Sequence, residues 1–266
     1  MSLSKFYKKV LSAIAWRQQV IYSAWMFRWV LYVKSRSMTL SLKPAIVFAP
    51  HQDDETLGCG GAIALKREQG VPVAVVFLTD GKASHLNHPK VNSEELVETR
   101  KQEAVTALTT LGVKPSEIHF LDQSDGSLSH LNATQHQHLL DQVIQLLQSF
   151  NPQEVYVPYR KDIHPDHEAT YALVQAAILK SNLQVELLQY PVWTRWNACE
   201  FDLKSQDLAN SYRLPIAPVR NKKIKALEAY RSQYLPLFPE VPTPLPPGFL
   251  RRFFAPYEVF FRVGAK

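Results

Sequence analysis

Apolar positions divide the chain into two parts. Residues 3–34 contain neither Gly nor Pro, and their hydrophobic side chains recur mostly at spacings of three and four, which predicts one long amphipathic helix. From Ala45 onward, short apolar runs alternate with helical patterns, and this alternation is typical of a mostly parallel sheet with helices on both faces. We therefore expect a helical extension over residues 1–42 and an α/β domain over residues 43–266.

The turn residues between these runs set the expected limits of the elements. Gly70 and Gly112 end two predicted helices, and Asn92 with Glu95 forms a candidate capping box for the second. Seven prolines between residues 236 and 256 predict an extended segment that covers the domain surface. Strands are expected from Ala45 and at residues 73–78, 117–121, 154–158, 184–190 and 257–263, and helices at residues 57–69, 92–111, 134–150, about 168–180 and 222–234.

Two of the apolar runs end in histidines and acidic residues. The first cluster, after the run from Ala45, comprises His51, Asp53, Asp54 and Glu55, and the second, after the run at residues 154–158, comprises His164, Asp166 and His167. Open α/β sheets bind ligands at the carboxyl ends of their strands, so both clusters are expected on the ligand-binding side. His51 and Asp54 are close enough in sequence to bind one cation as the chain turns into a helix.

A purely structural explanation exists for each cluster. Acidic residues just before a helix are ordinary caps that satisfy free N–H groups and the helix dipole, and Asp166 could serve in this way. Neither cluster is strong evidence alone. Because two strand ends each carry His and Asp, a shared metal site is the better interpretation.

Both clusters resemble the signature of a known family, the PIG-L/LmbE-like zinc-dependent N-acetylglucosamine deacetylases. The family has A-H-P-D-D-E after a strand and H-P-D-H further on; this chain has A-P-H-Q-D-D-E at residues 49–55 and H-P-D-H at residues 164–167. One extra residue precedes His51, and Gln52 stands where the family usually has Pro. Weaker matches extend the resemblance over most of residues 43–235. The resemblance implies a Rossmann-like domain.

The resemblance also implies roles for individual residues. His51, Asp54 and His167 would be the zinc ligands, and two imidazoles with one carboxylate are a set that leaves a zinc position open for water. Asp53 would be the general base, and His164 would stabilise the oxyanion of the transition state. Asp166 is expected to orient an imidazole, and Arg100 to bind substrate hydroxyl or phosphate groups. Mn, Fe or Co could replace zinc.

Composition limits the remaining possibilities. Two cysteines, Cys59 and Cys199, give no disulfide framework, which suits a reducing compartment such as the cytoplasm. The sequence has no C-x-x-C knuckle, so His and carboxylate side chains would have to hold a metal, and it has no P-loop or G-x-G-x-x-G motif. The net charge is +6, and eight of the 30 Lys and Arg residues precede the first acidic residue, Asp53.

Three explanations are open for the helix at residues 3–34. Its aromatic residues, its Lys and Arg residues and its lack of acids describe a helix lying on an anionic membrane surface, which would place the protein peripherally on the inner face of the membrane. Alternatively, the helix packs on the domain itself. A nucleic-acid arm is disfavoured by the continuous aromatic side, and a spanning helix by Arg17 and Arg28, which interrupt the apolar run.

We therefore expect a zinc hydrolase that removes acetyl from an N-acetylated amino sugar, which could be lipid-linked. Two alternatives stay open at this point. The same cluster could hydrolyse another acylated amine, such as an antibiotic or a thiol-cofactor precursor, because it acts on the carbonyl and scarcely specifies the rest. The domain could also bind a sugar or a metal without turnover.

Overall fold

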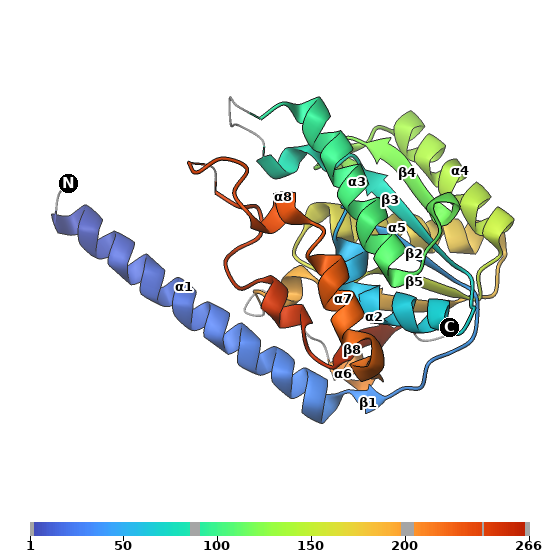
Figure 1. The fold of residues 1–266 in the computed structure, drawn as a ribbon, viewed down its shortest axis with the longest axis horizontal. Coiled ribbons are helices and arrows are strands. Elements are labelled where there is room, and N and C mark those ends of the chain that lie inside the picture. The colour runs from blue at the N-terminus through green and yellow to red at the C-terminus, as the bar shows by residue number, and fades with distance from the viewer. Residues whose placement is uncertain (1–2, 86–90, 198–204, 241, 264–266) are drawn as a thin grey trace.

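The computed structural model describes residues 3–85, 91–197, 205–240 and 242–263, with side chains from residue 14 onward and without those of residues 205 and 206; Cys199 lies outside these ranges. One eight-stranded sheet runs through the described part of the chain (Figure 1). Its strands, in spatial order, are β1 (Arg36–Ser37), β7 (Ser211–Pro215), β8 (Tyr257–Arg262), β6 (Glu186–Tyr190), β5 (Glu154–Pro158), β2 (Ala45–Ala49), β3 (Val73–Thr79) and β4 (Ile118–Gln123).

The strand order places the two motif-bearing strands side by side. β2 pairs in parallel with β5, with Ala45 opposite Glu154. From this pair the chain builds outward in both directions, through β3 and β4 on one side and through β6 on the other. β8 alone is antiparallel to its neighbours. The β2–β5 junction is therefore the topological switch point, where open α/β sheets bind their ligands.

Helices cover both faces of the sheet, as predicted (Figure 1). In β2, Ala45 and Val47 point to one face and Ile46 and Phe48 to the other, and all of them are buried, as expected for a parallel strand between two helical layers. One face packs against α2 (Asp54–Glu68), α3 (Ser93–Leu111) and α7 (Arg220–Leu227), and the other against α4 (Ala133–Phe150) and α5 (Pro165–Ser181).

Most predicted elements are present, with two differences. The helix expected at residues 222–234 is interrupted between α7 and α8 (Arg231–Tyr234). The interruption has a physical reason, since Tyr230 leaves the helical conformation and its buried hydroxyl donates a hydrogen bond to Glu55. β1 and β7 were not predicted, because β1 is only two residues long and β7 has Arg213 in place of an apolar run.

Glycines in α2 allow close packing of the helix. A Cβ at Gly58 would lie 2.2 Å from the Tyr190 ring, and a Cβ at Gly61 would lie 2.6 Å from Ile216. The backbone N–H groups of Gly61 and Ala62 donate to the buried carboxylate of Glu258. Close packing therefore accounts for these glycines, and no nucleotide-binding loop is needed to explain them.

The N-terminal helix α1 (Leu3–Trp29) continues as one π-helical turn, η1 (Val30–Lys34), and its first part projects away from the domain (Figure 1). Its last part packs on the domain and buries Phe27, Val30 and Leu31. A second face remains open, because Trp25 is 70% and Ile21 is 61% exposed. None of the described helices is long and apolar enough to cross a membrane.

The proline-rich segment contributes to the core. Leu245, Phe249 and Phe253 are buried against the face that holds α2 and α3, and residues Leu250–Phe253 form a 3₁₀ turn, η8. The segment therefore covers one helical layer with large apolar side chains and is not extended throughout.

Candidate metal centre and catalytic site

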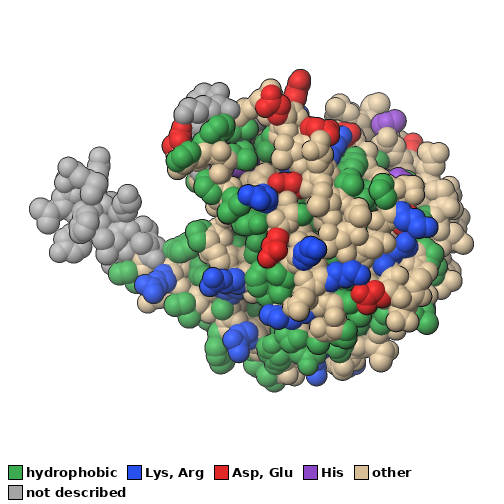
Figure 2. Space-filling view, viewed as in Figure 1, with side chains coloured by type: hydrophobic (Ala, Val, Ile, Leu, Met, Phe, Trp, Pro, Cys, Tyr) green, Lys and Arg blue, Asp and Glu red, His purple; other side chains and the backbone are tan. Residues whose placement is uncertain are grey.

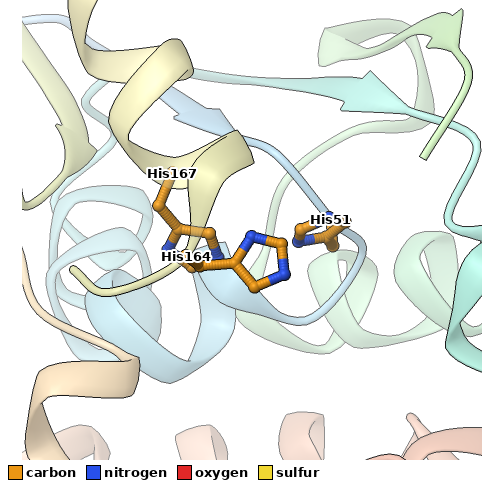
Figure 3. A group of neighbouring side chains, drawn as sticks. All are labelled: His51, His164 and His167. Atoms are coloured by element: carbon orange, nitrogen blue, oxygen red, sulfur yellow. The ribbon is translucent and has the colours of Figure 1, made fainter. Parts of the chain in front are cut away.

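The two sequence clusters meet at the switch point. His51 follows β2, whereas His164 and His167 lie at the start of α5, just beyond β5, and the three imidazoles gather in one place (Figure 3). Their ring centroids are 4.9 to 5.6 Å apart. One nitrogen from each ring lies within 4.8 Å of the others, which is a metal-binding arrangement.

Asp54 bridges two of these histidines. Its Oδ2 lies 3.2 Å from His51 Nδ1 and 3.2 Å from His167 Nε2. Ligand atoms bound to one zinc at about 2.0–2.1 Å in a tetrahedron are ~3.3 Å apart, so both separations match. His167 Nε2 is also buried, and apart from this contact with Asp54, which lacks hydrogen-bond geometry, it has no partner among the described residues. Such an orphaned nitrogen is expected of a metal ligand, and the residues present therefore fit a zinc-type ion.

Asp162 holds the His167 ring in place. Its Oδ2 lies 2.8 Å from His167 Nδ1, and its two oxygens also accept hydrogen bonds from the backbone of Val192, Trp193 and Thr194 and from the Thr194 hydroxyl. The carboxylate fixes Nδ1–H as the donor, so Nε2 is left as the free lone pair. Asp162 was not predicted from the sequence. Only its position, two residues before His164, could have indicated a role at the site.

Asp166 and Asp125 orient His51 in a similar way. His51 Nε2 lies 3.0 Å from Asp125 Oδ1 and 3.3 Å from Asp166 Oδ2. Asp166 is itself fixed by the N–H groups of Gly126 and Leu128, which lie beyond β4. The imidazole next to Asp166 is thus His51, from the other cluster. Asp125 was not among the site residues predicted from the sequence.

His51, Asp125 and Asp166 form a second possible metal group, with their ligand atoms also within 4.8 Å of one another. The Asp166 oxygens already accept two backbone hydrogen bonds, and this group would leave His167 Nε2 without a partner. A metal held by Asp54, His51 and His167 would explain both 3.2 Å contacts of Asp54 Oδ2 as well as the buried His167 Nε2. Both groups share His51.

The charges around the histidines favour a cation. Burial lowers the pKa of His167, but the charge of Asp54 and the hydrogen bond that His167 donates to Asp162 raise it to about 9. Burial acts in the same direction on His51, yet its contacts with Asp125, Asp166 and Asp54 raise that pKa well above its ordinary value. The carboxylates thus stabilise positive charge at this point, which a divalent ion would supply.

Asp53 lies beside the cluster in an unusual conformation. Its φ of 142° is in a region that L-residues rarely adopt, and its N–H donates to Glu55 Oε2. The carboxylate is 5% exposed. Burial, followed by the charge of Asp54, raises its pKa to about 8. A carboxylate whose pKa is near neutrality is suited to general base catalysis.

Arg100 holds the loop that carries Asp53. Its guanidinium donates to the carbonyl oxygens of Gly81 and Gln52, both at 2.8 Å, and Nη2 lies 3.8 Å from Asp53 Oδ1. The side chain borders the cavity but is only 2% exposed. Substrate binding by Arg100 stays a prediction, since two of its donors already have protein partners.

His164 is neutral in this arrangement. Burial and the neighbouring charges of His167 and His51 lower its pKa to about 4. Its Nδ1 accepts the N–H of Asp166 at 3.3 Å, so the ring hydrogen is assigned to Nε2. The sequence predicts that His164 stabilises the oxyanion, and its ring would do so as a neutral N–H donor.

A cavity of about 220 Å³ opens above these residues. His51, Asp53, Asp54 and His164 line its floor with Arg100 and Asp125, and its walls include Leu57, Trp193, Gln233, Pro244 and Leu245. The proline-rich segment therefore helps to form the entrance. Polar floor and apolar walls are typical of a site that binds a small molecule.

Comparison with known proteins agrees with this geometry. A family model described as GlcNAc-PI de-N-acetylase (PIG-L) matches residues 46–178. A probable N-acetyl-α-D-glucosaminyl L-malate deacetylase 2 of Bacillus cereus is 29% identical over 191 residues, 71% of this chain and 82% of the relative. The N,N′-diacetylchitobiose deacetylase of Pyrococcus horikoshii superposes with a TM-score of 0.57 at 23% identity, over 74% of this chain and 72% of that one.

The same fold occurs in a protein with a different reaction. The 4-carboxy-2-hydroxymuconate hydratase of Pseudomonas putida superposes with a TM-score of 0.64 at 19% identity, over 84% of this chain and 97% of that one. The fold alone therefore does not define the chemistry, and the class must come from the motifs and their relatives.

Motifs, site and relatives together define a deacetylase, a hydrolase acting on N-acetyl amide bonds. The chain belongs to the PIG-L family.

Proposed function

We propose that this protein removes the acetyl group from the nitrogen of an N-acetylglucosamine-type amino sugar, releasing acetate and a free amine. The observation that carries the proposal is that Asp54 Oδ2 contacts a nitrogen of both His51 and His167, with Asp53 lining the same cavity. The names of the relatives support an N-acetyl sugar as the substrate class.

In this proposal His51, Asp54 and His167 hold a divalent ion, with zinc first and Mn, Fe or Co as competitors. When bound, the ion polarises the amide carbonyl and makes water more acidic. Asp53 accepts a proton from the attacking water, whose oxygen forms the new bond to the carbonyl carbon. His164 Nε2–H donates to the developing oxyanion. Asp53 then returns its proton to the nitrogen as the C–N bond breaks.

The test is acetate release from N-acetylglucosaminyl compounds by protein loaded with zinc. Asp53→Asn should lower kcat by about 10²- to 10⁴-fold, because it removes the proton acceptor and keeps the side-chain shape. Asp141→Asn, at an exposed position on α4, is the matched control and should keep full activity. Metal content is measured in both variants. Full activity of a metal-loaded Asp53→Asn protein would reject the role of Asp53.

A panel of acylated amines distinguishes the proposed N-acetyl sugar substrate from the alternative substrates. Faster release of acyl groups from a non-sugar amine would favour the broader amidohydrolase. Metal binding without acetate release from any member of the panel would favour a binding module.

We further propose that α1 rests on an anionic membrane surface, which would bring a lipid-linked sugar within reach. Ile14, Ile21, Trp25 and Tyr32 share one open face of the helix, and each is at least 48% exposed. Figure 2 shows basic side chains beside hydrophobic ones along the part of α1 whose side chains are described. Aromatic side chains with flanking Lys and Arg are typical of helices in an anionic interface.

Point variants test this without disturbing the packed side of the helix. Ile21→Ser with Trp25→Ser should greatly reduce co-sedimentation with phosphatidylglycerol vesicles and leave acetate release from a soluble substrate unchanged. Substituting the exposed Leu179 of α5 by Ser gives the control. Unchanged vesicle binding by the α1 variant would refute the membrane proposal and would leave the deacetylase proposal standing.

A further inference from the structure

A second cavity, of about 370 Å³, lies where α1 meets the C-terminal segment. Its polar lining consists mainly of arginines, while Phe27, Leu31 and Phe254 form apolar walls. No acidic residue lines it among the residues that the structure describes. The arginines, from four separate parts of the chain, are Arg28, Arg195, Arg220, Arg251 and Arg252.

Among the described residues, none of these five positive charges has a carboxylate of its own. No salt bridge joins any of them to a carboxylate within the described ranges. The acid that acts on Arg195, Glu258, is already paired with Lys223 at 2.6 Å and accepts two backbone N–H groups. Like charges gathered in a partly buried pocket repel one another, so an anion in the pocket would be strongly favoured.

Two hydrogen-bond donors of the pocket arginines have no partner in the part of the chain that the structure describes. Arg195 is 5% exposed, and its Nε lies buried without an acceptor; the same holds for Nη1 of Arg252. Buried polar atoms of a folded protein are normally satisfied. Unpaired guanidinium N–H groups beside a cavity fit a planar or tetrahedral oxyanion, with phosphate as the usual partner of clustered arginines.

Packing fixes the positions of these side chains. Arg195 lies over the rings of Phe27 and Phe253, with its guanidinium carbon 5.3 and 4.5 Å from the centroids. Arg252 Nη2 donates to the Val20 carbonyl at 2.7 Å, and Arg220 Nε donates to that of Phe254. Arg195, Arg220 and Arg252 are therefore held in place by packing and hydrogen bonds, and their part of the pocket is preorganised.

We propose that this pocket binds a phosphate group, separately from the deacetylase site. The same chemistry has two possible sources, a soluble phosphate ester and the phosphate of a lipid headgroup. The exposed aromatic face of α1 begins at the pocket edge, because Tyr32 borders the pocket and belongs to that face. A lipid headgroup would thus be bound where α1 meets the membrane.

The experiment compares two double variants of the full-length protein that remove the same charge. Arg28→Gln with Arg251→Gln removes two exposed pocket arginines, and Arg17→Gln with Arg36→Gln removes two exposed arginines outside it. Equilibrium dialysis with radiolabelled inorganic phosphate measures binding of a soluble ion. Sedimentation with phosphatidic acid vesicles, against oleate-containing vesicles of the same surface charge, measures headgroup recognition. Urea unfolding and acetate release verify that each variant is folded and active.

The pocket variant should weaken phosphate binding by about tenfold or more, since each lost charged hydrogen bond costs on the order of one decade in affinity. The control variant should change it by less than about twofold. A loss seen with both phosphate and vesicles supports the site for either source, and a loss confined to phosphatidic acid vesicles assigns it to a lipid headgroup. Equal behaviour of the pocket and control variants in both assays would overturn the proposal, whatever the outcome of the deacetylase and α1 tests.

Discussion

Asp162→Asn tests whether one buried carboxylate prepares His167 for a metal. Asp162 is fully buried, and each of its oxygens accepts at least three contacts from protein donors. An amide has only one acceptor oxygen. Whichever way the new side chain turns, its NH₂ group faces donors, either His167 Nδ1–H and Trp193 N–H or the Thr194 groups.

The magnitude follows from these contacts. Hydrogen bonds to a charged group contribute about 1.5–3 kcal/mol each, and a buried donor without an acceptor costs about 1–3 kcal/mol. We expect the free energy of unfolding to fall by about 2–4 kcal/mol. Metal affinity should fall by about 10- to 100-fold, because the His167 tautomer is no longer fixed by a carboxylate.

Urea unfolding measures the first quantity, and zinc competition with a chromophoric chelator measures the second. Thr194→Val is the matched control: it removes one hydroxyl donor to Asp162 and keeps the carboxylate. It should cost about 1.5–3 kcal/mol of stability and leave zinc affinity within about twofold of wild type. A folded Asp162→Asn protein that binds zinc as tightly as wild type would refute the reasoning.

Three further predictions follow from contacts at the site and in the core. His164→Ala should lower kcat by about 10²- to 10³-fold with little change in KM, because it removes a donor that acts on the oxyanion. Lys223→Met should lower the free energy of unfolding by about 3–5 kcal/mol in urea, because it leaves the Glu258 carboxylate buried without its cation. Gly58→Ala should cost about 1–3 kcal/mol in the same assay, because its Cβ meets the Tyr190 ring.

Each of these three has a control. Substituting the exposed His138 by Ala should leave kcat unchanged, and an equal loss there would mean that the His164 effect is not local. Lys222→Met, at the partly exposed neighbouring position, should stay within about 0.5 kcal/mol of wild type; equal effects at Lys222 and Lys223 would contradict the buried pair. Gly126→Ala is the control for Gly58→Ala. A Cβ at Gly126 would meet no atom within 4 Å, so any loss of stability in this variant would reflect only the φ of 81° at Gly126.

The sequence predicted the site residues better than their supporting contacts. Apolar runs locate β2 and β5, and residues that follow parallel strands meet at one edge, so the proximity of His51 and His167 could be predicted. Asp162 and Asp125 could not be predicted, because their roles depend on loops that only the folded chain brings together. Nothing in the local pattern distinguishes such a carboxylate from a surface Asp.

The N-terminal helix shows a similar limit. Its periodicity predicted one apolar face, whereas the structure has two, of which one packs on the domain and the other is open. Packing on the domain and binding to a membrane surface are therefore compatible explanations for this helix. A helix of this length carries more than one apolar stripe, and only the partner surface decides which stripe is buried.

The attachment of α1 has a consequence for how the enzyme responds to its surroundings. Trp16 packs against Trp196, and the helix contacts η5 (Trp193–Arg195), whose backbone N–H groups hold Asp162 and whose first residue borders the reaction cavity. The packing site of α1 and the carboxylate that orients His167 therefore share one short segment, residues 193–195.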